Sequence, residues 1–138
     1  MEARREAPAP AEGGLAFTEL ASEDPQATRR FLEKVFGWRF RTVSMPMGEY
    51  QSYETPDGRG GIRPLAPKEQ PSSLAYVRVS DLGESQRRVE AAGAQIVLPR
   101  VEVPGMGCFF WFRVPGGPLL ACWQDLPAEA TRTEEGNR

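Results

Sequence analysis

The residue types that most often carry catalysis are scarce in this chain of 138 residues, which contains no histidine. Histidine is the commonest general base and the commonest metal ligand, and it activates the serine or cysteine of most nucleophile pairs. The best remaining candidate for a general base is Glu19, a weak one, which alternation along its strand places away from the following helix. An ion pair between Glu19 and Arg78 is an equally good interpretation. The residues therefore assign no firm catalytic group.

The two cysteines, Cys108 and Cys122, flank a turn at residues 115–117. If the flanking strands form a hairpin about Gly116, Cys122 lies opposite residue 110 or 111, which leaves Cys108 out of register for a disulfide. We expect two free thiols. Cys108 is a poor candidate for a nucleophile, because no histidine is present to activate its thiol.

The charge balance argues against a nucleic-acid partner. Nineteen acidic and seventeen basic residues are interspersed, for a net charge of -2. No apolar run approaches the roughly eighteen residues of a membrane span, and the N-terminus lacks an apolar signal core. We therefore expect a soluble, cytoplasmic protein with no membrane partner. An apolar content of 40% in a chain of this length favours one domain.

The first recognisable unit is a strand, a helix and three further strands. Asp24 suits a helix N-cap, Pro25 the first helical position and Gly37 the helix end. An apolar stripe at helical spacing runs between them, made of Phe31, Leu32, Val35 and Phe36. Strands are expected at residues 15–20, 38–47, 49–55 and 60–65. The first half of the chain therefore has the pattern βαβββ.

The same pattern returns in the second half. Strands are expected at residues 73–80, 95–103, 108–114 and 119–124, with a helix at 81–92. The helix cap Asp81 and the helix-ending Gly93 follow their counterparts in the first half at nearly the same interval. The sequence thus predicts an α+β fold in which two βαβββ modules, 15–65 and 73–125, form a curved mixed sheet around a groove in a pseudo-twofold arrangement. Residues 1–14 are predicted to be a disordered tail and 126–138 a flexible one.

Several short segments carry a resemblance to a known family. The sequences FTEL, VFGW, YVRVSDL, AAGAQI, PGMG and VPGGPLL occur in this order between residues 17 and 120. Together they resemble the vicinal oxygen chelate superfamily, which includes glyoxalase I, bleomycin-resistance proteins and extradiol dioxygenases. The resemblance covers residues 15–123 and implies the fold predicted above. It also implies a homodimer.

The resemblance places metal ligands at four positions, and this chain departs from the pattern at each. Phe17, Leu74 (or, one residue off, Ser73) and Ala121 stand at three of them, and no carboxylate lies between Asp57 and Glu69 to supply the fourth. Apolar side chains offer no donor to a divalent cation. We therefore expect no metal and no cofactor. A metal held between subunits by unrecognised carboxylates is the remaining alternative.

Apolar residues at ligand positions suggest a lined pocket for a small molecule. The alternation of side chains along the strands places part of the pocket lining on the groove side of the sheet. Tyr53 is added to the lining as a possible hydrogen-bond donor to the ligand. Of the aromatic run at residues 109–112, two side chains must face each way, and alternation does not decide which pair faces the pocket. The predicted ligand-binding residues are Phe17, Glu19, Tyr53, Leu74, Tyr76, Arg78, Trp111, Ala121 and Trp123. The competing interpretation is that the aromatic members simply fill the groove as core.

The function that these expectations favour is a metal-free protein of the glyoxalase/bleomycin-resistance type that binds a small apolar or aromatic ligand in the groove between the modules. One alternative is a glyoxalase-like lyase, isomerase or dioxygenase with a non-standard site. Another is a non-catalytic interaction module. Bleomycin itself is a doubtful ligand, because a cationic drug favours an acidic groove and Arg78 is expected in this one.

Overall fold

The computed structural model describes residues 12–45 and 48–126, which form eight strands and two helices. Two compact units are present: an N-terminal unit, Phe17–Ala75, and a C-terminal unit, Tyr76–Arg138 together with Met1–Ala16. The predicted α+β class and the two βαβββ modules are confirmed. Most of the predicted tails, 1–14 and 126–138, lies outside the described residues.

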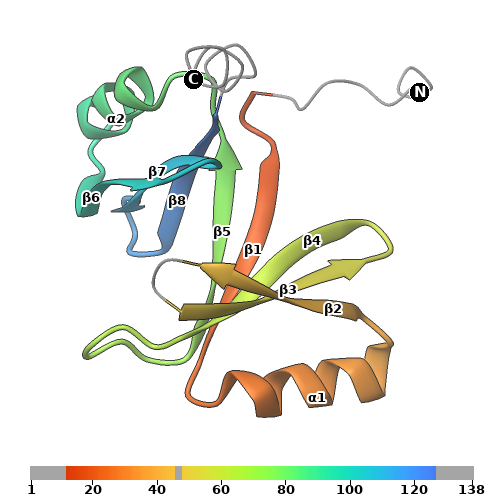
Figure 1. Cartoon of the computed structure of the whole chain (residues 1–138). Coiled ribbons are helices and arrows are strands. Elements are labelled where there is room, and N and C mark those ends of the chain that lie inside the picture. The colour runs from red at the N-terminus through yellow and green to blue at the C-terminus, as the bar shows by residue number, and fades with distance from the viewer. Residues whose placement is uncertain (1–11, 46–47, 127–138) are drawn as a thin grey trace, which may run out of the picture. The chain divides into compact units, whose positions relative to one another are not determined.

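The N-terminal unit is a four-stranded mixed sheet with one helix (Figure 1). Its strand order is β2-β3-β4-β1, in which β1 and β4 are parallel and the other neighbours are antiparallel. The elements are β1 (Leu15–Ser22), α1 (Pro25–Phe36), β2 (Arg39–Met45), β3 (Gly48–Thr55) and β4 (Gly58–Pro64). The first two residues of β1 count with the other unit.

The C-terminal unit repeats this topology. Its strand order is β5-β8-β7-β6, with β5 and β8 parallel and the other neighbours antiparallel. The elements are β5 (Ser72–Arg78), α2 (Leu82–Ala91), β6 (Gln95–Val103), β7 (Gly107–Arg113) and β8 (Leu119–Asp125). The first four residues of β5 count with the N-terminal unit. Of the predicted N-terminal tail, Gly13 and Gly14 exchange backbone hydrogen bonds with Arg78.

Helix α1 begins and ends where its capping residues predict. The Asp24 carboxylate accepts a hydrogen bond from the Ala27 backbone N–H at 3.2 Å, and Gly37 ends the helix in the left-handed conformation with φ 70°. The predicted apolar stripe is wrong in detail, because only Leu32 of its four residues is buried. The side chains of the other three, Phe31, Val35 and Phe36, are exposed.

The polar side chain of Arg29, rather than the other predicted apolar residues, contacts the sheet beside Leu32. The guanidinium of Arg29 donates a hydrogen bond to Gln51 Oε1 at 2.6 Å and lies 5.3 Å from the ring centroid of Phe40. Gln51 is buried, with 3% of its surface exposed. The row of Arg29 and Leu32 therefore faces the sheet.

The core of the C-terminal unit lies between α2 and one face of its sheet. It consists of Val79, Leu82, Cys108, Phe110, Phe112 and Cys122. Cys122 stands opposite Phe110, and Cys108 opposite Gln124, so the predicted register is confirmed and both thiols are free. Burial raises the pKa of Cys122 to about 11.

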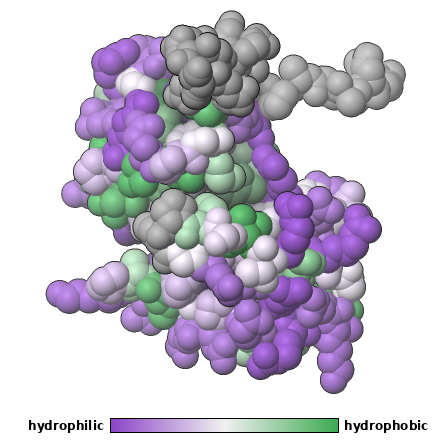
Figure 2. Space-filling model, in the orientation of Figure 1, coloured by the Kyte–Doolittle hydropathy of each residue, from purple (hydrophilic) through white to green (hydrophobic). Residues whose placement is uncertain are grey.

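Among the described residues, neither helix has the length and apolar character that crossing a bilayer requires. In the view of Figure 2, hydrophilic residues cover much of the visible surface, with apolar residues in patches between them.

Candidate aromatic binding face

Four aromatic residues lie together on the face of the C-terminal sheet that points away from α2. They are Tyr76 on β5, Phe109 and Trp111 on β7, and Trp123 on β8, and we call them the aromatic face. Their placement follows from alternation, because Phe110 and Phe112 of the same strand belong to the α2 core. Ala121 lies between Tyr76 and Trp111 in the same row, and its small side chain leaves room for both rings.

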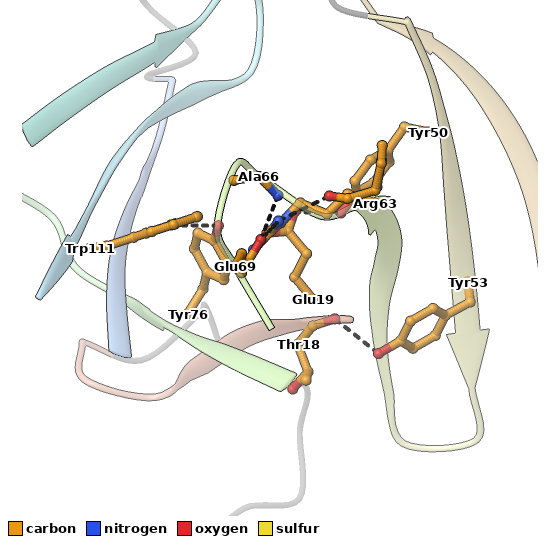
Figure 3. A network of polar contacts seen from close by, with 10 residues as sticks. Thr18, Glu19, Tyr50, Tyr53, Arg63, Ala66, Glu69, Tyr76 and Trp111 are labelled. Atoms are coloured by element: carbon orange, nitrogen blue, oxygen red, sulfur yellow. Dashed lines mark hydrogen bonds and ion pairs between the residues drawn. The ribbon is translucent and has the colours of Figure 1, made fainter. Parts of the chain in front are cut away.

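The rings of the aromatic face contact one another in a chain. The ring of Phe109 stacks on Trp123 with centroids 6.2 Å apart and an interplanar angle of 21°, and it meets Tyr76 edge-on at 5.6 Å. Phe109 and Trp111 also stack, with ring centroids 6.5 Å apart and planes 29° from parallel. The indole N–H of Trp111 donates a hydrogen bond to the Tyr76 hydroxyl at 3.0 Å (Figure 3).

The four rings of the aromatic face differ in how deeply they are buried. Tyr76 is 2% exposed and Trp123 is 6% exposed, whereas Phe109 and Trp111 are half-buried. The half-buried Leu98 of β6, directly opposite Trp111, extends the apolar surface past β7. The two buried rings thus support two half-buried rings whose planes lie 29° from parallel. Such an arrangement can stack against a flat organic molecule.

Three residues fix the position of Trp123 at one end of the aromatic face. Gly107 leaves space for the indole ring, because a Cβ at this position would lie 2.7 Å from a carbon of that ring. The indole N–H of Trp123 donates to Asp125 Oδ1 at 2.7 Å. The other oxygen of Asp125 accepts a hydrogen bond from the guanidinium of Arg78.

The N-terminal unit carries a polar cluster of its own. Arg63 on β4 donates from Nε to Glu19 Oε1 at 2.8 Å and from its two terminal nitrogens to both oxygens of Glu69, at 2.7 and 2.8 Å. The hydroxyl of Tyr50 donates to Glu19 Oε2 at 3.1 Å, and the Ala66 backbone N–H donates to Glu69 (Figure 3). The cluster ties the loop after β4 to β1 and β3.

The charges in this cluster stabilise one another. The bidentate hydrogen bonds from Arg63 lower the pKa of Glu69, and the same contacts raise the pKa of Arg63. Burial and the neighbouring Glu19 carboxylate raise the pKa of Tyr50, so its hydroxyl remains a donor. Both oxygens of Glu19 already accept hydrogen bonds. A general base needs an accessible oxygen, so this arrangement favours a structural role for Glu19.

The predicted site residues are divided between the two units. Tyr76, Arg78, Trp111, Ala121 and Trp123 come together in the C-terminal unit. Glu19 and the buried Leu74 belong to the N-terminal unit, as does the half-buried Phe17.

Tyr53 lies apart from the other predicted residues of its unit, on the α1 face of the sheet. Its ring stacks on Trp38 at 4.8 Å and packs with Leu32, and its hydroxyl donates to the Thr18 carbonyl oxygen at 2.9 Å. Burial and the charge of Glu19 raise the pKa of this hydroxyl to about 12. Because these contacts make Tyr53 part of the core, we leave it out of the candidate site.

The donor set does not fit the divalent metal of the superfamily. Leu74 and Ala121, at two of the ligand positions, are buried and apolar, with 2% and 0% of their surfaces exposed. The carboxylates of Glu19 and Glu69 both form ion pairs with Arg63. Over residues 12–45 and 48–126, no three histidine, cysteine, aspartate or glutamate side chains come together in a way that could hold a metal ion.

Sequence reasoning missed three residues of these clusters. The sequence does not single out Arg63 and Glu69, and Asp125 lies one residue beyond the predicted last strand, 119–124. For Asp125 a signal exists, because a residue two positions after Trp123 on one strand shares its face. For Glu69 there is none, because its loop has no periodicity.

Comparisons with known proteins agree with the fold. No family model matches the chain. The anthracycline biosynthesis protein DnrV of Streptomyces peucetius is 29% identical over 132 residues, which cover 83% of this chain and 48% of that protein. The chain thus spans about half the length of the curated relatives it matches.

Two solved structures give the structural likeness. Methylmalonyl-CoA epimerase from Mycobacterium tuberculosis is 16% identical with a TM-score of 0.68, covering 94% of this chain and 99% of that one. A glyoxalase/bleomycin resistance protein/dioxygenase superfamily member from Vibrio splendidus 12B01 is 18% identical with a TM-score of 0.60, covering 80% and 97%. The chain has the fold of this superfamily, and the predicted resemblance is confirmed.

Proposed function

We propose that this protein binds a small planar aromatic ligand against the aromatic face, without a metal. The observation that carries the proposal is the pair of half-buried rings, Phe109 and Trp111, lying 6.5 Å apart and 29° from parallel. A ligand of two or three fused rings is long enough to contact both. Aromatic stacking adds about 0.5–1.5 kcal/mol per ring pair beyond the area buried.

Preorganisation supports this function. The indole of Trp111 is held by its hydrogen bond to Tyr76, and Phe109 is held between Tyr76 and Trp123. A surface whose side chains are already ordered loses little conformational entropy on binding. The name of one relative, the anthracycline biosynthesis protein of Streptomyces peucetius, also supports a planar aromatic ligand, because the anthracycline ring system is flat and polycyclic.

The test is a calorimetric titration with naphthol and with its saturated counterpart decahydronaphthol. The two compounds share a hydroxyl and a carbon framework, but only naphthol is flat. We expect naphthol to bind with a negative heat-capacity change and decahydronaphthol to bind at least about threefold more weakly, because it cannot stack. Equal binding of the two, or binding of neither, overturns the proposal.

Two variants locate the site. Trp111→Leu removes one of the two stacking rings, and we expect naphthol affinity to fall about three- to tenfold. Phe36→Leu removes an aromatic ring that is 61% exposed on α1, and we expect it to leave the affinity unchanged. A thermal melt of each variant verifies that it is folded. If the two variants behave alike, the ligand does not bind at the aromatic face.

A further inference from the structure

Asp125 makes two contacts at the end of the aromatic face, each with a different oxygen. Oδ1 accepts a hydrogen bond from the indole N–H of Trp123 at 2.7 Å, and Oδ2 accepts one from the guanidinium of Arg78. Arg78 and Trp123 are themselves cross-strand neighbours on β5 and β8. A single carboxylate therefore orients an aromatic ring and neutralises a cation beside it.

The side chains of Arg78 and Asp125 are buried to different extents. The side chain of Arg78 is 16% exposed and that of Asp125 is 52% exposed. Arg78 thus lies within the sheet face with its charge turned toward Asp125, while Asp125 remains in contact with solvent. Among the described residues of β7, Arg113 is the charged residue whose position in the strand places it on the aromatic face. It lies at the end of the strand away from Gly107, where its guanidinium donates to the Gly117 carbonyl oxygen at 2.8 Å.

Without Asp125, the end of the aromatic face would present a largely desolvated guanidinium. Such a group binds carboxylates strongly, because charge-assisted hydrogen bonds are stronger where water is excluded. With Asp125 in place, an anionic ligand would have to compete with an intramolecular carboxylate that is already bound.

We propose that Asp125 sets the charge preference of the aromatic face, so that the site selects uncharged aromatic ligands over aromatic carboxylates. The proposal rests on the proposed function, because it concerns the same surface. It makes Asp125 a specificity-determining residue that acts through Arg78.

The test compares naphthol with naphthoate, two flat molecules of similar size that differ in charge at neutral pH. We expect the wild-type protein to bind naphthol more tightly than naphthoate. The variant Asp125→Asn keeps a carbonyl oxygen to accept the Trp123 hydrogen bond but removes the charge that holds Arg78. We expect it to raise the ratio of naphthoate affinity to naphthol affinity about tenfold or more above the wild-type ratio.

Two further variants exclude trivial explanations. Glu54→Gln removes a carboxylate from the exposed ion pair with Arg39 and so makes the same change in net charge. We expect it to leave both affinities unchanged. Arg78→Gln leaves the Asp125 charge uncompensated, and we expect it to favour naphthylmethylammonium, an aromatic cation, over naphthol. This reciprocal change does not require Asp125→Asn to be stable.

The outcomes separate this proposal from the function it rests on. If the wild-type protein binds naphthol, but Asp125→Asn and Arg78→Gln leave the ratios of the affinities unchanged, the inference about Asp125 is overturned and the proposed function stands. If the wild-type protein binds none of the probes, both are overturned. A gain in naphthoate affinity that added sodium chloride abolishes, with naphthol affinity insensitive to salt, supports the role of Arg78.

Discussion

The ring of Tyr50 crosses β4 directly over Gly61. A Cβ on Gly61 would overlap the hydroxyl and ring carbons of Tyr50. The crossing takes the Tyr50 hydroxyl from β3, over the intervening strand, to within 3.1 Å of Glu19 on β1. The glycine is needed here for space rather than for backbone conformation, since its φ is not in the left-handed region.

Gly61→Ala should destabilise the protein by about 2 kcal/mol, because the added methyl group displaces the Tyr50 ring and the hydrogen bond to Glu19. Urea-induced unfolding measures the change. The control is Gly58→Ala, where a Cβ would meet only Thr55 Oγ1 at an ordinary 3.5 Å. The cost should disappear in a Tyr50→Ala background. An equal cost with and without Tyr50 would contradict the proposed packing.

The bidentate pair of Glu69 and Arg63 should make stability depend on acidity. Because the native pKa of Glu69 is lowered from its ordinary value of 4.5, the ionised carboxylate stabilises the fold above that pH. This contribution is lost as the pH falls below about 4.5 through the native pKa. Glu69→Gln should cost about 2 kcal/mol at neutral pH and lose less stability than wild type on acidification.

Unfolding measured at neutral pH and at about pH 3.5 tests this prediction. The matched control is Glu54→Gln, whose carboxylate side chain is 67% exposed and pairs with an exposed arginine. That variant should follow the wild-type pH profile. A Glu69→Gln profile that runs parallel to wild type would show that the pair contributes no pH-dependent stability.

Local chemistry made much of the fold predictable. The caps Asp24 and Asp81 and the helix-ending Gly37 act on their immediate neighbours, so their effect can be read from the chain. Which residues of α1 are buried could not be predicted in this way, because the hydrogen bond between Arg29 and Gln51 spans 22 positions of the sequence. A helical apolar stripe identifies a helix but does not guarantee which of its residues face the sheet.

The two neighbours Phe31 and Leu32 should respond differently to truncation. Leu32 is 9% exposed and packs with Tyr53 and Ile62, so Leu32→Ala should cost about 2–4 kcal/mol. Phe31 is 58% exposed, so Phe31→Ala should cost less than about 1 kcal/mol. Thermal or urea unfolding compares the two. If Phe31→Ala is the more damaging variant, α1 packs as the sequence pattern suggested.

The candidate site was predictable only in part. Alternation separates Phe109 and Trp111 from Phe110 and Phe112, but the packing of α2 decides which pair it covers. The Arg63 cluster depends on a loop that folds back after β4, and no pattern in residues 65–71 encodes that. The ligand-binding role of the predicted residues and the expected homodimer stay predictions.

The most direct test of the central claim is a nuclear magnetic resonance titration of the three tryptophan indole N–H groups with naphthol. Trp111 lies on the aromatic face, Trp123 supports it, and Trp38 stacks on Tyr53 in the N-terminal unit. The resonance of Trp111 should move most, that of Trp123 less, and that of Trp38 should stay in place. Saturating naphthol that leaves Trp111 unmoved, or that moves Trp38 alone, would contradict binding at the aromatic face.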